Sequence, residues 1–141
     1  NEVSLLRAGP QAAKLQIWVD NRQRMDELVC DGVLVATPAG STAYNYSAHG
    51  PILPMGADVL AMTALNAYRP RRWRGALLPK TAVVRIDVLD NTKRPVMADA
   101  DSISFKNVKK VEISSETKIQ HRILFNEGHG LDERLIQEQF V

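Results

Sequence analysis

The sequence predicts a mainly β domain with short helices, of the α+β class, in which two sheets pack as a β-sandwich. Three observations support this fold class. Apolar and polar residues alternate near the amino end, β-type segments return after residue 75, and helical patterns are confined to short stretches. A chain of 141 residues is large enough for one core, so we expect residues 1–141 to form a single domain.

The first predicted strands cover Asn1–Arg7 and Lys14–Val19, where apolar residues alternate with polar ones. The next apolar stretch, Glu27–Ala36, is interrupted by Asp31-Gly32. Asp-Gly between two apolar runs is a strong signal for a hairpin or tight turn. We therefore expect a hairpin or a tight turn that carries the carboxylate of Asp31.

Two helices are predicted in the middle of the chain. The turn-rich string Thr37–Thr42 precedes Ala43–Ala48, which is compatible with a short helix that Ser41 or Thr42 would cap. The second helix is predicted at Ala57–Ala67, because Ala, Leu and Met dominate this stretch and favour helical backbone.

The second half of the chain is predicted to be mostly strand, divided by Pro79, Asp90-Asn91 and Pro95. A short helix is expected at Asp132–Phe140, where acidic residues in the first turn complement the helix dipole. The predicted strands cover Gly75–Leu78, Ala82–Leu89, Ser102–Phe105, Val108–Ser114 and Lys118–Leu124.

Composition limits the classes of protein to consider. The net charge of +2, from 18 basic and 16 acidic residues, gives no reason to expect a nucleic-acid partner. No apolar run approaches the roughly 18 residues that a membrane-spanning helix needs, so no membrane partner is expected.

Cys30 is the only cysteine, which rules out an internal disulfide and favours a cytoplasmic protein. His49, His121 and His129 lack metal-ligand spacing, so no metal is expected in the chain itself.

Two polar stretches allow both a functional and a structural interpretation. Thr37–Ser47 would present hydroxyl and N–H groups to a ligand phosphate or base, or its hydroxyls would only cap a helix. The basic run Arg69–Arg74 would hold phosphate or RNA, or form an exposed or subunit-facing loop anchored by Trp73. Because this run is short and interrupted by Pro70, its sequence favours the loop.

The segment Asp31–Leu53, DGVLVATPAGSTAYNYSAHGPIL, resembles the signature block of ATP-dependent NAD kinases, with the bacterial branch the most similar. Asn1-Glu2 at the head of an apolar strand resembles the short Asn-Glu/Asp motif of that family. Similarity continues through Ala64–Pro79 and Asp132–Phe140, so the resemblance covers nearly the whole chain.

The resemblance implies the C-terminal, NAD-binding domain of an enzyme that transfers the γ-phosphoryl group of ATP to the 2′-hydroxyl of the adenosine ribose of NAD. It also implies an N-terminal α/β domain with a Gly-Gly-Asp-Gly motif, whose aspartate would be the general base. That motif is missing from this sequence, as is a Walker-type loop, so no catalytic residue is assigned here. ATP with Mg²⁺, the N-terminal domain, and a homodimer or homotetramer are expected for the intact enzyme.

The resemblance implies which residues of this chain contact NAD. They are two residues at the start of the first strand, the aspartate of the Asp-Gly pair, and residues of one loop. Glu2 would accept hydrogen bonds from ribose hydroxyls, and the ring of Tyr44 would lie against adenine. Asp31 resembles a nicotinamide-side or neighbouring-subunit contact, although a turn residue chosen for its backbone is the alternative. The implied NAD-binding residues are Asn1, Glu2, Asp31, Thr42, Ala43, Tyr44, Asn45 and Ser47.

The sequence departs from the family pattern in its late segment, where the family aspartate aligns with either Asp99 or Asp101, and neither receives a role. Two alternatives to an NAD kinase stay open at this point. One is a non-catalytic nucleotide-binding or regulatory domain. The other is a related lipid kinase of the diacylglycerol or sphingosine type, which the Thr-Pro-Ala-Gly-Ser-Thr-Ala-Tyr match disfavours.

Overall fold

A computed structural model describes residues 1–141 as ten strands and two helices. The strands are β1 (Glu2–Arg7), β2 (Ala13–Val19), β3 (Arg22–Cys30), β4 (Gly32–Ala36), β5 (Val59–Leu65), β6 (Gly75–Pro79), β7 (Val84–Leu89), β8 (Val96–Ala100), β9 (Ile103–Phe105) and β10 (Lys110–Ile113). The helices are α1 (Tyr44–Ser47) and α2 (Leu131–Gln139). No helix is both long and apolar enough to cross a membrane.

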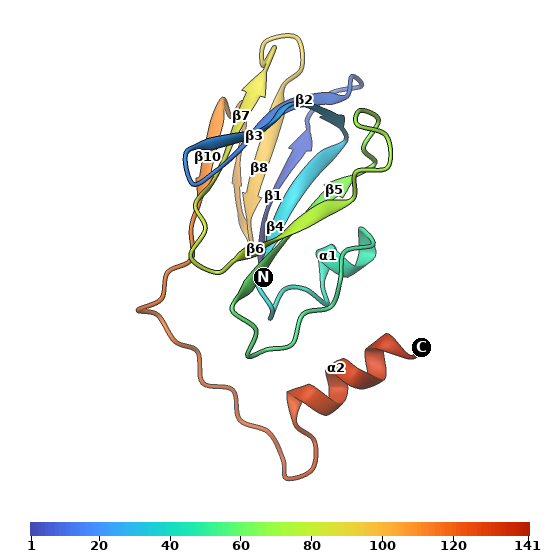
Figure 1. Ribbon diagram of the computed structural model, residues 1–141, viewed down its shortest axis with the longest axis vertical. Coiled ribbons are helices and arrows are strands. Elements are labelled where there is room, and N and C mark those ends of the chain that lie inside the picture. The colour runs from blue at the N-terminus through green and yellow to red at the C-terminus, as the bar shows by residue number, and fades with distance from the viewer.

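The strands form two antiparallel sheets that pack face to face (Figure 1). One sheet has six strands in the order β6-β5-β4-β1-β8-β9, and the other has four in the order β10-β7-β2-β3. Seventeen buried side chains form one core between the sheets, and all but Ala82 come from their strands. Leu5, Leu15 and Ile86 are among the most buried. The predicted mainly β, two-sheet fold is confirmed.

The alternation of apolar and polar residues near the amino end corresponds to strands, as predicted. In β2 the residues at every second position, from Ala13 to Val19, are buried and face the core. In β1, Leu5 points into the core, whereas Leu6 lies on the opposite face of the six-stranded sheet. That second face supports the candidate site.

The helix predicted at Ala57–Ala67 is wrong, because β5 occupies Val59–Leu65. This strand lies between β4 and β6, and nearly every residue in it is buried on one face or the other. A strand covered on both faces has a continuous apolar run, which periodicity alone does not distinguish from a buried helix. Pairing with two neighbouring strands outweighs the modest helix preference of Ala, Leu and Met.

Of the two structures predicted at Asp31-Gly32, a hairpin or a tight turn, the hairpin does not form, and the chain bends at Asp31. Cys30 pairs with Ala13 in the four-stranded sheet, whereas Gly32 pairs with strands of the six-stranded sheet. Asp31 is therefore the point where the chain crosses between sheets. Gly32 serves close packing there, because a Cβ at this position would overlap the carbonyl oxygen of Leu5.

The strand predicted at Lys118–Leu124 does not form, and these residues run away from the sandwich as an exposed connection towards α2 (Figure 1). A strand needs a neighbour to accept its backbone hydrogen bonds, and none lies beside this segment. By contrast, β8 was not predicted, because Ala and Asp are poor strand formers. It pairs with β1 on one side and β9 on the other. The helix predicted at Asp132–Phe140 is confirmed as α2.

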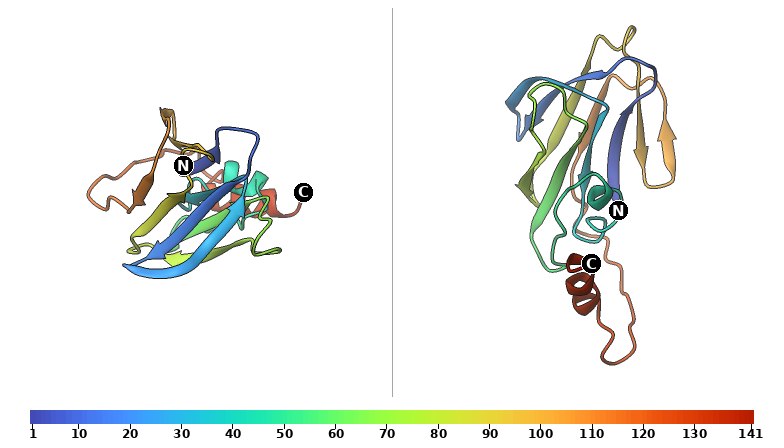
Figure 2. Two further views of the ribbon diagram at one scale, coloured as in Figure 1. Left: turned by 90° about the horizontal axis from the view of Figure 1, so that it is seen from above. Right: turned by 90° about the vertical axis from the view of Figure 1, so that its right-hand side faces the viewer.

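The outer face of the six-stranded sheet is partly covered by α1 and the loop that precedes it (Figure 2). A small apolar cluster joins them: Leu34, Ala36 and Leu65 from the sheet pack with Leu6 and with Ala48 at the end of α1. This packing places the polar loop of residues 37–43 at one end of the sheet.

Candidate functional site

The structure joins the Asn1-Glu2 motif to Thr37, which lies 36 residues after Asn1 in the sequence. The main-chain N–H and the hydroxyl of Thr37 both donate to the carbonyl oxygen of Asn1, at 3.0 and 3.1 Å. Gly40 packs so closely on Asn1 that a Cβ there would overlap its main chain. The glycine therefore allows the Thr-Pro-Ala-Gly turn to lie against the head of β1.

Ser41 orders the loop, but it does not cap α1 as predicted. Its hydroxyl donates to the carbonyl of Pro38 at 2.7 Å and accepts from the main-chain N–H of Leu53 at 2.9 Å. The N-cap position of α1 is Ala43, and no side chain bonds to the free N–H groups there. Ser41 is not the cap, because its hydroxyl joins two loop segments. Thr42 is not the cap either.

Asn45 is completely buried, and its amide is fully engaged within the protein. The amide nitrogen donates to the carbonyls of Ser41 at 3.1 Å and Pro51 at 2.8 Å, and the amide oxygen accepts from the Thr63 hydroxyl at 2.6 Å. This network fastens the loop and α1 onto β5. The side chain of Asn45 therefore shapes the loop from inside.

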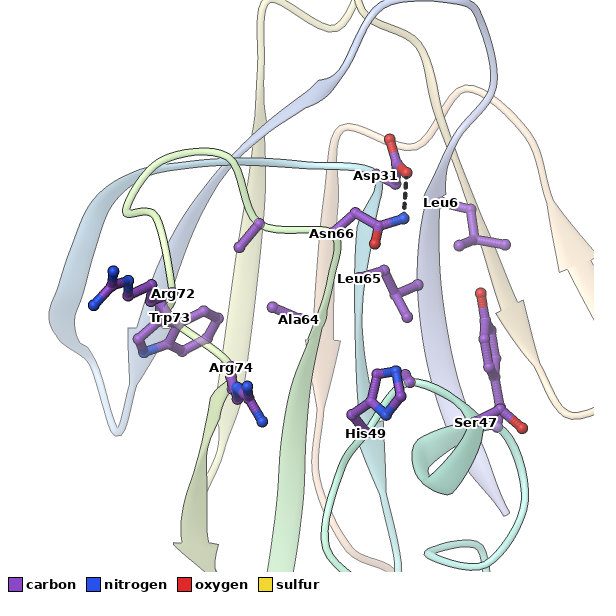
Figure 3. A pocket seen from close by; sticks show the side chains of 13 residues that line it. Leu6, Asp31, Ser47, His49, Ala64, Leu65, Asn66, Arg72, Trp73 and Arg74 are labelled. Atoms are coloured by element: carbon purple, nitrogen blue, oxygen red, sulfur yellow. Dashed lines mark hydrogen bonds between the residues drawn. The ribbon is translucent and has the colours of Figure 1, made fainter.

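A hollow of about 580 Å³ lies where the Asp31 crossover, α1 and the loop after β5 meet (Figure 3). A volume of this size lies in the range of small-molecule sites. Three predicted site residues, Asp31, Tyr44 and Ser47, line it together. The remaining lining residues are Leu6, Ala48, His49, Ala64, Leu65, Asn66, Ala67, Arg72, Trp73 and Arg74.

Asp31 is held at the edge of this pocket by two donors. Arg7 Nε lies 2.7 Å from one carboxylate oxygen. The Asn66 amide nitrogen lies 2.8 Å from the other, and Figure 3 shows this bond. The hydrogen bond from Asn66, followed by that from Arg7, lowers the pKa of Asp31. Asp31 therefore presents an ionised carboxylate whose charge is balanced by Arg7.

A second polar group lies on the outer face of the sheet. One carboxylate oxygen of Glu2 is shielded from solvent and has no hydrogen-bond partner, and burial raises the pKa of Glu2. Burial also raises the pKa of Tyr44, and the negative charges of Glu2, Asp31 and Asp99 raise it further because they disfavour a phenolate. Tyr44 thus stays a neutral hydroxyl in an acidic neighbourhood.

The other predicted site residues lie outside the large pocket. Asn1 and Glu2 line a smaller hollow of about 180 Å³ beside Thr37. Thr42 and Ala43 are half-buried in the loop before α1. The structure therefore places three of the eight predicted residues in the larger hollow and two in the smaller one, and the other three lie in the loop and α1.

Sequence reasoning missed five polar or aromatic residues of the pocket wall. Asn66 carries no motif, and His49 was considered only as a metal ligand. Arg72, Trp73 and Arg74 belong to the basic run, whose sequence favours an exposed or subunit-facing loop. The run does form a loop, and part of it faces the pocket. No three His, Cys, Asp or Glu side chains lie close enough to hold a metal ion.

The comparisons with known proteins agree on one family. Residues 1–121 match the family model of the ATP-NAD kinase C-terminal domain. An NAD kinase of Cereibacter sphaeroides is 74% identical over 141 residues, which are the whole of this chain and 56% of that protein. An NAD kinase of Brucella suis is 55% identical over 140 residues, or 99% of this chain and 54% of that protein. The chain thus spans about half the length of these relatives.

Solved structures show the same fold. A yeast NADH kinase, solved in complex with NADH, superposes with a TM-score of 0.74 at 29% identity, over 84% of this chain and 34% of that one. An NAD kinase from Archaeoglobus fulgidus, solved in complex with ATP, gives a TM-score of 0.72 at 23% identity, over 83% of this chain and 45% of that one. With the family model matched over residues 1–121, this chain belongs to the ATP-NAD kinase C-terminal domain family.

Proposed function

We propose that the intact protein transfers the γ-phosphoryl group of ATP to the 2′-hydroxyl of the adenosine ribose of NAD, forming NADP and ADP, and that this domain binds NAD. One observation carries the proposal: Asp31, Tyr44 and Ser47 come from different parts of the signature block and line one pocket of about 580 Å³. Family membership and the names of the relatives support it.

The polar groups of the site suit a dinucleotide. The carboxylate of Glu2 would accept a hydrogen bond from a ribose hydroxyl, a charge-assisted bond worth about 1.5–3 kcal/mol. The ring of Tyr44, about one-third exposed, offers a face to adenine. NAD would also be contacted by main-chain and hydroxyl groups of Thr42, Ala43 and Ser47. Asn45 would act by shaping the loop, since its amide is already occupied.

The rest of the catalyst is assigned to an N-terminal domain that brings ATP, Mg²⁺ and a general base. The side chains of this chain do not form a metal-binding cluster, so the Mg²⁺ is assigned to the ATP phosphates and that domain. Phosphoryl transfer depends largely on positioning and electrostatics, so a domain that orients the acceptor ribose contributes directly to the rate. We also propose a cytoplasmic homodimer or homotetramer.

The proposal is tested by measuring NADP formation from NAD and ATP with three proteins: the intact enzyme, this 141-residue chain alone, and the intact Tyr44→Ala variant. The intact enzyme is expected to turn over and the chain alone is not. Base–aromatic stacking is worth about 1–3 kcal/mol, so Tyr44→Ala is expected to raise the KM for NAD roughly five- to hundredfold. Tyr44→Phe, which keeps the ring, is the control and should change the KM far less.

Two results would contradict the proposal. Turnover by the isolated chain at the rate of the intact enzyme would refute the division of labour between the domains. Phosphorylation of diacylglycerol or sphingosine by the intact protein, without phosphorylation of NAD, would identify a lipid kinase instead.

A further inference from the structure

Two of the four arginines in the loop between β5 and β6 lie on the wall of the large pocket. Arg72, Trp73 and Arg74 form one side of it, with Asp31 and Asn66 at the upper end in this view (Figure 3). Arg74 also lines an adjoining hollow of about 350 Å³. Both arginine side chains are exposed to solvent and therefore accessible to a ligand in the pocket.

The pocket arginines lack partners within the protein. The ion pairs of the molecule join other residues, and neither Arg72 nor Arg74 donates a side-chain hydrogen bond. The other two arginines of the loop, Arg69 and Arg71, stack on the ring of Tyr68 at 5.6 and 5.8 Å. Only Arg72 and Arg74 therefore carry positive charge on the pocket wall without a partner.

The one acidic residue of the pocket does not neutralise these arginines. Asp31 bonds to Arg7 at 2.7 Å and to Asn66 at 2.8 Å, so its charge is already compensated. The Arg72–Arg74 side of the pocket is left with a net positive charge. Guanidinium groups bind phosphate oxygens through paired N–H donors, which makes phosphate the chemical group that best fits this wall.

The backbone holds the two arginines in place. Val29 N–H donates to Arg69 at 2.8 Å and ties the start of the loop to β3, while Ala64 N–H donates to the carbonyl of Arg74 at 2.9 Å and ties its end to β5. The half-buried Trp73 packs against the main core between them. Arg72 has a φ of 76°, a left-handed backbone conformation that is unusual for a residue with a Cβ.

We propose that Arg74, with Arg72 at the rim, forms an anion subsite that binds the diphosphate of NAD in the large pocket. The subsite rests on the proposed function for the identity of the nucleotide, and on the unpaired arginines for the chemistry. Tyr44 and Ser47 on α1 face the same pocket and would contact the nucleoside attached to that diphosphate.

The experiment is calorimetric titration of the intact protein with NAD, pyrophosphate, AMP and adenosine. The variant Arg72→Gln/Arg74→Gln removes both pocket charges. The matched control, Arg69→Gln/Arg71→Gln, removes two charges from the same loop outside the pocket. We expect the pocket variant to bind NAD and AMP about tenfold more weakly and to leave adenosine binding unchanged. The affinity of the pocket variant for NAD should also depend less on salt concentration.

A single Arg74→Gln variant and an Arg74→Lys variant keep the test valid if the double variant folds poorly, because Lys keeps the charge and should restore part of the affinity. Equal NAD affinity in the pocket variant and the wild type, or an equal loss in the control, would overturn the subsite. Loss of pyrophosphate affinity alone, with NAD binding intact, would show a site for free phosphate and would also overturn the assignment to NAD.

The result can be separated from the proposed function itself. If the wild-type protein phosphorylates NAD and the pocket variant keeps the wild-type KM and affinity, only the subsite fails. If the wild type does not phosphorylate NAD, the proposed function fails, and the comparison of AMP with adenosine still decides whether Arg72 and Arg74 bind a nucleotide phosphate.

Discussion

The pKa of Asp31 is lowered by residues that are distant in sequence. Arg7 and Asn66 each occupy one of its carboxylate oxygens and lower its pKa below the ordinary value of 3.8. A group with a lowered pKa in the folded state stabilises the fold above its unfolded pKa. That stabilisation is lost as the pH falls through the folded pKa.

Arg7→Gln is expected to raise the pKa of Asp31 towards 3.8, since a guanidinium donor is lost. The pair is more than a third exposed, so the cost at pH 7 should be only about 0.2–1 kcal/mol. This difference in stability from the wild type should shrink as the pH falls below the ordinary pKa.

Carbon-13 NMR titration of the Asp31 carboxyl measures the pKa shift, and denaturation at pH 7 and pH 3 measures the stability difference. Lys14→Gln, which breaks a different ion pair, is the control, and equal titration midpoints in wild type and Arg7→Gln would contradict the prediction.

Cys30 illustrates the opposite direction of pKa shift. Burial raises the pKa of its thiol to about 12, so almost none is ionised at neutral pH. We expect Cys30 to resist alkylation by iodoacetamide at pH 8 in the folded protein and to react completely in guanidinium chloride. Mass spectrometry of the Cys30 peptide measures both states. Rapid labelling of the folded protein would show that the thiol is accessible, contrary to the structure.

At the scale of elements, the Asn45 amide joins α1 to β5 through its bond with Thr63. Asn45→Ala would leave the Thr63 hydroxyl and two carbonyl groups without partners. Each unsatisfied buried group costs about 1–3 kcal/mol, so the free energy of unfolding should fall by at least that amount. Urea denaturation measures the loss.

The double variant Asn45→Ala/Thr63→Val provides the matched comparison. It removes the stranded hydroxyl as well, and should recover part of the stability that Asn45→Ala loses. If Asn45→Ala weakens NAD binding but leaves the unfolding free energy unchanged, the side chain contacts the ligand directly. The network would then not have the structural role that its burial indicates.

At the scale of the whole molecule, α2 and the connection before it leave apolar side chains uncovered. Ile136 is 51% exposed and Phe140 is 87% exposed. The chain spans 56% of the length of a relative that is 74% identical. We expect the proposed N-terminal domain to pack on this face of α2, since burial of apolar area stabilises by about 25 cal/mol per Å².

An Ile136→Ser/Phe140→Ser variant tests this packing. In the intact protein the two substitutions should lower the Tm by several degrees, because apolar contacts with the other domain are lost. In the 141-residue chain alone the same substitutions should leave the Tm unchanged. Equal shifts in both proteins would mean that α2 makes its contacts within this chain.

The sequence by itself determined the family and the fold class. The Asp31–Leu53 block is long enough for its resemblance to the family to be recognised without a structure. The alternation of apolar and polar residues in β2 directly indicates a strand with one buried face. Both signals are local, because they lie in neighbouring residues of one segment. The terminal helix α2 was predictable for the same reason.

Only the tertiary structure decided which residues meet. β5 is a strand because β4 and β6 pair with it, which its helix-favouring composition does not reveal. Asp31 faces the same pocket as Tyr44 and Arg74 because the chain changes sheets at Asp31, and because separate hydrogen bonds fix the α1 loop and the basic loop. Such contacts depend on the packing of segments that are distant in sequence, and the pattern within each segment does not record that packing.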